Sequence, residues 1–224
     1  MDARESRALL TARKLLVEKA CAIELRIRGI LRSFGLKVGK VGRIGFEARV
    51  AELTAGHVVL RERVHSLLDA RSALRGGVAK LDRRLRTIDR EDDVCRRFMT
   101  VPGVGAVTAL TVRTAIDDPS RFRSSKLVGA HFGLTPRRYQ SGETDISRSI
   151  SRAGDASARA ALFDAANVML SRVKRWSALK AWAVRVAKRR GGGRARVALA
   201  RKLGVILHRM WIDGTDFDYG KQPA

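Results

Sequence analysis

The chain has 224 residues, and its 46 Lys and Arg against 22 Asp and Glu give a formal net charge of +24. Repulsion among so many cations disfavours a compact fold, and nucleic acid is the partner whose phosphates neutralise it. No run of about 18 apolar residues is present, so the composition predicts no membrane-spanning helix and no membrane partner. A basic membrane-surface protein is the weaker alternative, because the arginines are spread along the whole chain rather than along one helix face.

Residues 1–94 are predicted to form two long helices separated by a glycine-rich loop over residues 35–45. Apolar residues recur every seven positions in both helices, at Leu9, Leu16, Ile23 and Ile30, and again at Leu60, Leu67, Leu74, Leu81 and Ile88. A second seam in the later helix is interrupted by Arg71. Heptads of this length favour a coiled coil, formed within a helical hairpin or between copies, over an ordinary amphipathic bundle. We therefore expect a homodimer or higher oligomer.

Residues 95–224 are predicted to form a compact helical domain, so the fold class is expected to be mainly all-α. The segment Val101-Pro-Gly-Val-Gly105 resembles the turn of a helix-hairpin-helix element and is followed by a helix. Gly103 and Gly105 allow close backbone approach, and amides at the next helix N-terminus suit a phosphate. A common turn is the alternative interpretation. We treat Gly103 and Gly105 as candidate nucleic-acid-binding residues.

Residues 135–154 are predicted to form a basic loop or short hairpin around Ser141, because the segment has no sustained apolar period. A serine that attacks phosphorus needs an exposed hydroxyl and neighbouring cations to stabilise the transition state. Those cations are Arg137, Arg138, Arg148 and Arg152. Ser141 is therefore a candidate nucleophile, although a Ser-Gly turn is a frequent structural feature.

Further along the chain, Asp155 is a predicted N-cap. Lys188, Arg189 and Arg190 precede three glycines and are expected to lie in a flexible, nucleic-acid-binding linker over residues 188–196. Trp176 and Trp182 are expected in the core, and the polar tail from Asp213 is expected to fray.

No metal site is predicted. Cys21 and Cys95 are too few for a thiolate zinc site and are expected to be reduced and buried. The histidines show no metal-ligand spacing, and the acidic residues lack the arrangement that a two-magnesium nuclease requires.

Several motifs together resemble a known family. They are Val101-Pro-Gly-Val-Gly105, Phe122-Arg123, Ser125-Lys126, Gly129–Glu143, Ile150–Asp155 and the helix around Ala165-Ala166. This ordered set is similar to the C-terminal domain of insertion-sequence transposases of the DEDD type, the serine-dependent, bridge-RNA-guided "one-ten" family, and the heptad segment resembles that family's middle region.

The resemblance implies DNA transposition, with Ser141 linking covalently to a DNA 5′ phosphate and a structured guide RNA supplying sequence specificity. It also implies a preceding RuvC-like domain whose four acidic residues bind Mg²⁺. We expect that domain to be missing from this chain, so that no cofactor is held here. A cytoplasmic, nucleoid-associated bacterial protein is the expected setting.

Two functions follow. The first is the DNA-joining part of a transposase that uses Ser141. The alternative is a truncated, non-catalytic dimer that binds nucleic acid and derives from a transposase.

Overall fold

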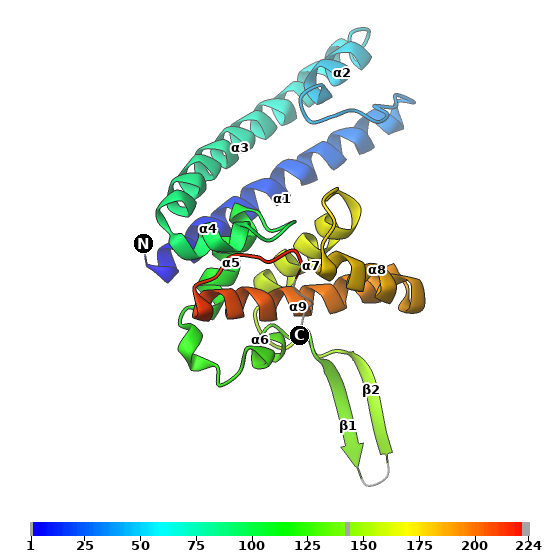
Figure 1. The fold of residues 1–224 in the computed structure, drawn as a ribbon. Helices are drawn as coiled ribbons and strands as arrows, with labels where there is room; N and C mark the ends of the chain where they lie inside the picture. The colour runs from blue at the N-terminus through cyan, green and yellow to red at the C-terminus, as the bar shows by residue number, and fades with distance from the viewer. Residues whose placement is uncertain (1, 142–143, 221–224) are drawn as a thin grey trace. The chain divides into compact units, whose positions relative to one another are not determined.

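The computed structural model describes residues 2–141 and 144–220, and within these ranges it describes residues 138–148 by their backbone alone. Helices dominate the described residues, so the predicted all-α class is confirmed (Figure 1). The elements in chain order are α1 (Ala3–Ser33), α2 (Phe46–Leu53), α3 (Val58–Glu91), α4 (Asp93–Met99), α5 (Ala106–Ile116), η1 (Pro119–Arg121), η2 (Ser125–Leu127), α6 (Val128–His131), β1 (Pro136–Ser141), β2 (Thr144–Ile150), α7 (Ala156–Ser171), α8 (Ala178–Arg190) and α9 (Gly192–Asp213).

The chain divides into two compact units. Unit 1 comprises Met1–Arg7 and Leu85–Ala224, and unit 2 comprises Ala8–Arg84. The long helices α1 and α3 therefore contribute to both units.

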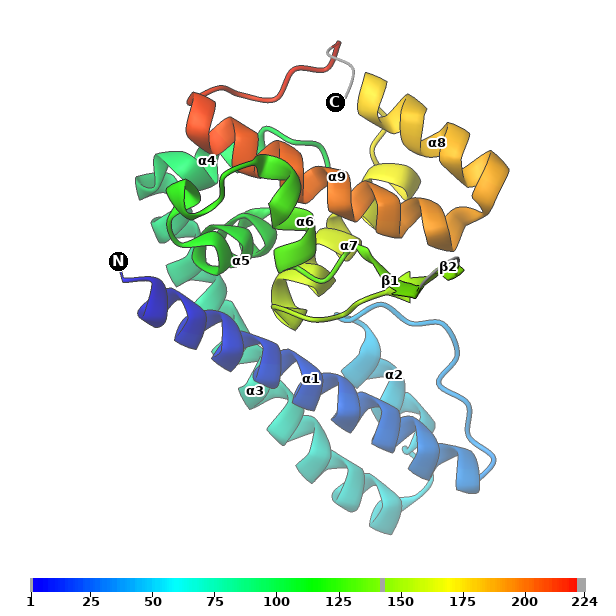
Figure 2. The same cartoon turned by 90° about the horizontal axis from the view of Figure 1, so that it is seen from below.

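Unit 2 is a helical hairpin in which α1 and α3 run antiparallel, side by side in both views (Figures 1 and 2). The helices with heptad repeats thus pack against each other within one chain. Arg13 Nε donates to Asp82 Oδ1 across the pair at 2.5 Å. The apolar core lies toward the α2 end and comprises Ile27, Leu31, Val38, Phe46, Val50, Leu60 and Val64.

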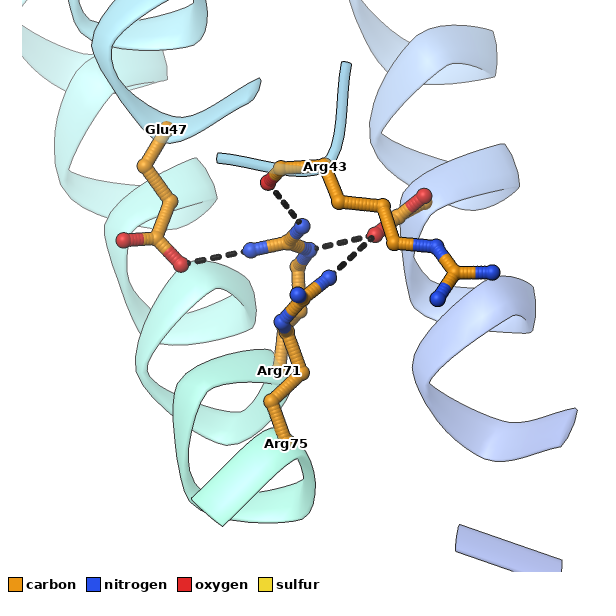
Figure 3. Close-up of polar contacts among 5 residues, drawn as sticks. Arg43, Glu47, Arg71 and Arg75 are labelled. Carbon is orange, nitrogen blue, oxygen red and sulfur yellow. Dashed lines mark hydrogen bonds and ion pairs between the residues drawn. The ribbon is translucent and has the colours of Figure 1, made fainter. Parts of the chain in front are cut away.

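Arg71, which interrupts the heptad seam, is 1 % exposed and forms a buried polar hub (Figure 3). Its guanidinium donates to Glu24 Oε1 at 2.7 Å, to Glu47 Oε1 at 2.6 Å and to the Arg43 carbonyl at 2.9 Å. It also lies over the Phe46 ring, 4.9 Å from its centroid. The planar, five-donor guanidinium can satisfy all these partners at once.

In unit 1, helix α9 packs against α4, α6, α7 and α8 (Figure 2). Small and apolar side chains bury this contact, among them Leu199, Leu203 and Leu207 of α9, which are fully buried. The predicted cap of α7 is confirmed, because the Asp155 carboxylate accepts from the Ser157 and Ala158 amides.

The basic segment after α6, for which the sequence predicted a loop or a short hairpin, forms a two-stranded antiparallel ribbon, β1–β2. Its register pairs Tyr139 with Ile146 and Ser141 with Thr144, with an irregularity between Pro136 and Arg138. Pairing between these two neighbouring strands defines the ribbon, although the segment lacks an apolar alternation.

The prediction of a flexible linker over residues 188–196 is wrong. Helix α8 continues to Arg190, α9 begins at Gly192, and Gly191 alone separates them at φ +82°. Only Gly191 needs the glycine-permissive conformation, and the buried Ala195 and Leu199 anchor the first turns of α9.

Three further expectations are wrong. Cys21 is exposed, although Cys95 is buried as expected. Trp176 is 59 % exposed rather than in the core. The tail after Asp213 does not fray through its described residues, because the Phe217 amide donates to Thr100 Oγ1 and the Ala178 amide donates to the Tyr219 carbonyl.

Candidate nucleic-acid interface

The α4–α5 turn gives its two predicted glycines different roles. Gly103 has φ +89°, and a Cβ placed on it would lie 2.6 Å from the Ala165 carbonyl oxygen of α7. Gly103 therefore allows the turn to approach the backbone of α7 rather than a ligand. Gly105 is the N-cap residue of α5, has no side-chain cap, and faces open space where a Cβ would stand. Gly105 is the one of the two that leaves room for a ligand near the α5 amides.

The ribbon carries Ser141 at the end of β1, directly opposite Thr144. The side chains of Ser141, Arg138 and Arg148 lie outside what the structure describes. Arg137, at the ribbon's base, is exposed and donates from Nη2 to the Ser151 carbonyl at 3.3 Å. At roughly 3.3 Å per residue, β1 spans about 17 Å between Pro136 and Ser141.

The root of the ribbon is a backbone crossing that leaves no room for side chains. A Cβ on Gly133 would lie 2.1 Å from the Ala153 carbonyl oxygen, and one on Gly154 would lie 1.9 Å from that of His131. The Arg152 amide donates to the Gly133 carbonyl, and Arg152 itself has φ +56°. This left-handed conformation is uncommon for a non-glycine residue. The crossing therefore fixes where the ribbon leaves the helices.

A groove of about 2020 Å³ runs along α9 in unit 1, bordered by η2, the ribbon's root and the α8–α9 turn. The cations in its lining are Arg123, Lys126, Arg152, Arg190, Arg194, Arg201, Lys202 and Arg209. Arg152 and Arg190 were predicted site residues. Lys188 and Arg189 are exposed beside them at the end of α8, outside the lining.

Sequence reasoning missed the α9 members of this basic groove. Arg194, Arg201, Lys202 and Arg209 stand at spacings of seven, one and seven residues, which places them on one side of a helix. That spacing was available in the sequence. Their juxtaposition with Arg123 and Lys126 was not, because those residues reach the groove only through tertiary packing.

His208 of α9 is fully buried and holds the η1–η2 segment, which forms one wall of the groove, against α9. Its Nε2 lies 3.0 Å from the Pro119 carbonyl and its Nδ1 2.9 Å from Ser125 Oγ. Burial lowers the pKa of His208, so the ring is neutral near pH 7. A carbonyl can only accept, so Nε2 carries the proton and Ser125 Oγ donates to Nδ1. The imidazole thereby holds η1 and η2 in place.

Trp182 lines the groove, and Lys202 Nζ lies 4.8 Å from its ring centroid. Burial lowers the pKa of the Lys202 ammonium. An aromatic face beside several cations suits bases and phosphates of a nucleic acid.

Within residues 2–141 and 144–220, no three His, Cys, Asp or Glu side chains gather where they could hold a metal ion. None of the helices in that same part of the chain is both long and apolar enough to cross a membrane.

Residues 95–183 match the family of IS116/IS110/IS902 transposases. The matched segment includes the α4–α5 turn, the ribbon, α7 and the first part of α8.

Similarity extends well beyond this segment. The chain is 29% identical over 212 residues to the transposase for insertion sequence element IS1111A of Coxiella burnetii, covering 92% of this chain and 58% of that protein. It is 28% identical over 221 residues to the transposase for insertion sequence element IS1328 of Yersinia enterocolitica, covering 96% and 65%. A shorter match, 40% identical over 65 residues, joins it to the pilin gene-inverting protein of Moraxella bovis and covers 29% and 20%. The chain thus spans about three fifths of the length of the transposases it matches.

Proposed function

We propose that this chain is the DNA-joining part of an insertion-sequence transposase. The observation that carries the proposal is the basic groove at the root of the ribbon that bears Ser141. The ribbon lies within residues 95–183, which match transposases. The cations of the groove would neutralise the phosphates of a duplex whose backbone follows it. The ribbon is long enough to reach a strand about 17 Å away.

In this proposal Ser141 Oγ attacks a DNA phosphorus. The Oγ–P bond forms, the P–O bond to the 3′ oxygen breaks, and the serine becomes linked to a 5′ phosphate. The serine proton passes to a base or water in the assembled complex, and the departing 3′ oxygen takes up a proton. Arg137, Arg138, Arg148 and Arg152 follow the same segment and are proposed to stabilise the charge on the five-coordinate phosphorus.

Magnesium has no step in this scheme. The described residues offer no cluster of carboxylates to hold it, and the resemblance assigns the metal to a RuvC-like domain. A structured guide RNA that selects the DNA is likewise a proposed partner, to which the basic groove and the exposed cations at the end of α8 would bind through phosphates.

The second candidate is a non-catalytic nucleic-acid-binding protein. It is supported by the placement of the groove cations largely on α9 and η2, which gives the chain a phosphate-binding surface independent of Ser141. Under this alternative the groove binds nucleic acid and no covalent step follows.

The deciding experiment is a denaturing gel of end-labelled DNA incubated with the chain, a RuvC-like domain supplied in trans, guide RNA and Mg²⁺. We expect a protein–DNA adduct with wild type and with Ser147→Ala, a serine of the same ribbon, and none with Ser141→Ala. An adduct that survives Ser141→Ala would contradict the nucleophile assignment. Tight binding without any adduct in all three proteins would favour the non-catalytic alternative.

A further inference from the structure

The end of the described chain is an acidic tail, residues 213–220, with the sequence Asp-Gly-Thr-Asp-Phe-Asp-Tyr-Gly. It has three carboxylates and no cation in a protein whose formal net charge is +24. Gly214, at φ +65°, turns the chain back after α9. The tail then crosses unit 1 toward the start of α8 (Figure 2).

The tail is docked at successive points. The Thr215 amide donates to the Met210 carbonyl at 3.2 Å, and the Phe217 amide donates to Thr100 Oγ1 at 3.0 Å. The Tyr219 carbonyl accepts from the Ala178 amide at 2.9 Å, and Arg175 lies 3.7 Å from the Tyr219 ring centroid. These contacts hold the tail in one path along the surface, with its three aspartates exposed.

That path borders the basic groove. Asp213, Asp216 and Asp218 are part of the groove's lining, together with Arg209 and the other cations. At the end of α9, Asp213 Oδ2 accepts from Nε of the groove cation Arg209 at 2.7 Å. Asp216 Oδ1 lies 3.9 Å from Nε of Arg97, which is outside the groove's lining. The Asp213 carboxylate also raises the pKa of Arg209. The tail thus gives one end of the groove carboxylates where a nucleic acid would place phosphates.

We propose that the acidic tail is an intramolecular competitor that nucleic acid must displace from the basic groove. The inference rests on the proposed function, since it assumes that the groove binds nucleic acid. Guanidinium groups donate hydrogen bonds to carboxylate and phosphate oxygens in the same geometry, so the two anions compete for the same donors. The tail's ion pairs are exposed, and pairs of that kind contribute about 0–1 kcal/mol each, so a polyanion can displace them.

The test compares two double variants that change the net charge equally. Asp216→Asn/Asp218→Asn neutralises the tail, while Glu62→Gln/Asp164→Asn neutralises two exposed acids outside the groove. Affinity for a labelled 30-base-pair duplex is measured at low and at moderate salt. We expect the tail variant to bind about three- to tenfold more tightly than the control variant, with the larger difference at low salt.

Equal affinity of the two double variants would overturn the proposal that the acidic tail competes with nucleic acid. Absence of binding by wild type and both variants would overturn the proposed function, and the tail proposal with it. A second measurement follows the wild-type chain by hydrogen exchange. Saturating duplex should speed exchange of the Phe217 and Ala178 amides, which the docked tail protects, and unchanged protection in a complex that demonstrably forms would contradict displacement.

Discussion

Arg71 Nε and Glu24 Oε1 lie 2.7 Å apart and join α3 to α1 across the core side of unit 2. In the sequence Arg71 stands where a heptad requires an apolar residue. In the structure the same position supplies a guanidinium that satisfies two carboxylates and a backbone carbonyl. A buried polar contact of this kind specifies which faces of two helices meet.

Arg71→Ala is expected to lower the free energy of unfolding by about 3 kcal/mol, because it removes a buried partner from Glu24 and Glu47 and leaves a cavity. Arg71→Met should lose less, since it keeps most of the packing. Denaturant titration followed by circular dichroism measures both. Arg75→Ala is the control, because Arg75 is 36 % exposed and 3.8 Å from Glu24. A larger loss at Arg75 than at Arg71 would refute the buried hub.

Asp89 gives a pH-dependent prediction. It is 2 % exposed, neither carboxylate oxygen has a hydrogen-bond partner among the described residues, and burial, followed by the Asp92 charge, raises its pKa to about 6. The raised pKa means that the charged form destabilises the folded state. The penalty is absent below pH 3.8 and grows to about 3 kcal/mol above pH 6.

Asp89→Asn should therefore raise the free energy of unfolding by about 2–3 kcal/mol at pH 7 and by much less at pH 4. Asp164→Asn, on the exposed side of α7, should show no such difference. Denaturant melts at the two pH values make the comparison. A stabilisation of equal size at both would show that Asp89 is not a buried charge.

Substituting the two glycines of the α4–α5 turn should have different effects on stability. Gly103→Ala is expected to destabilise unit 1 by more than about 2 kcal/mol, because of its positive φ and the contact with the Ala165 carbonyl. Gly105→Ala should leave stability within about 1 kcal/mol, since its Cβ meets nothing. Thermal melts give the result. Equal stability of the two variants would rule out the packing role of Gly103. If Gly105→Ala weakens DNA binding and leaves the stability unchanged, the N-terminus of α5 contacts a phosphate.

Binding by the basic groove should depend on salt through its cations. Replacing Arg194 and Arg201 with Gln is expected to make the log–log slope of affinity against salt shallower by about 1.8, at roughly 0.9 per phosphate contact on duplex DNA. Arg26→Gln/Arg63→Gln in unit 2 is the matched control. If the control variant changes the slope as much as the groove variant, the main contacts are not in the groove.

The ribbon and its root offer a second set of cations, which shares only Arg152 with the groove. Neutralising Arg137, Arg138 and Arg152 together should also shallow the salt slope, by up to about 2.7 if each touches a phosphate. The same fluorescence anisotropy titration applies. An unchanged slope would show that none of these three cations, Arg152 of the groove included, makes a main phosphate contact. Adduct formation would then test whether they act only on the reacting phosphate.

Local patterns predicted much of this fold. Apolar periodicity identified the long helices, and the side chain of Asp155 marked the start of α7. Composition misled where tertiary contacts override it. Three consecutive glycines suggested a linker, yet the buried Ala195 holds α9 helical almost from its start. The polar tail is ordered by three hydrogen bonds, at Thr215, Phe217 and Tyr219.

The candidate site was predictable only in part. Arg152 and Arg190 were identified because they lie near sequence motifs, and both line the groove. Arg123 and Arg209 were not identified as site residues. Each belongs to a local pattern, but they are 86 positions apart and only the packing of η2 on α9 brings them to one surface. Local patterns do not reveal which distant residues converge in this way.

The junction of α8 and α9 has a last consequence. Lys188, Arg189 and Arg190 close α8, where the helix dipole favours cations, but Gly191 alone separates them from the N-terminus of α9. The N-terminus of α9 disfavours cations because of the helix dipole. Its first turn has no acidic residue, and Arg194 follows near its start. The corner is therefore electrostatically frustrated, since the charges that suit one helix end oppose the next. An anion seated there would relieve the conflict, so the first turn of α9 should become more ordered when its partner arrives.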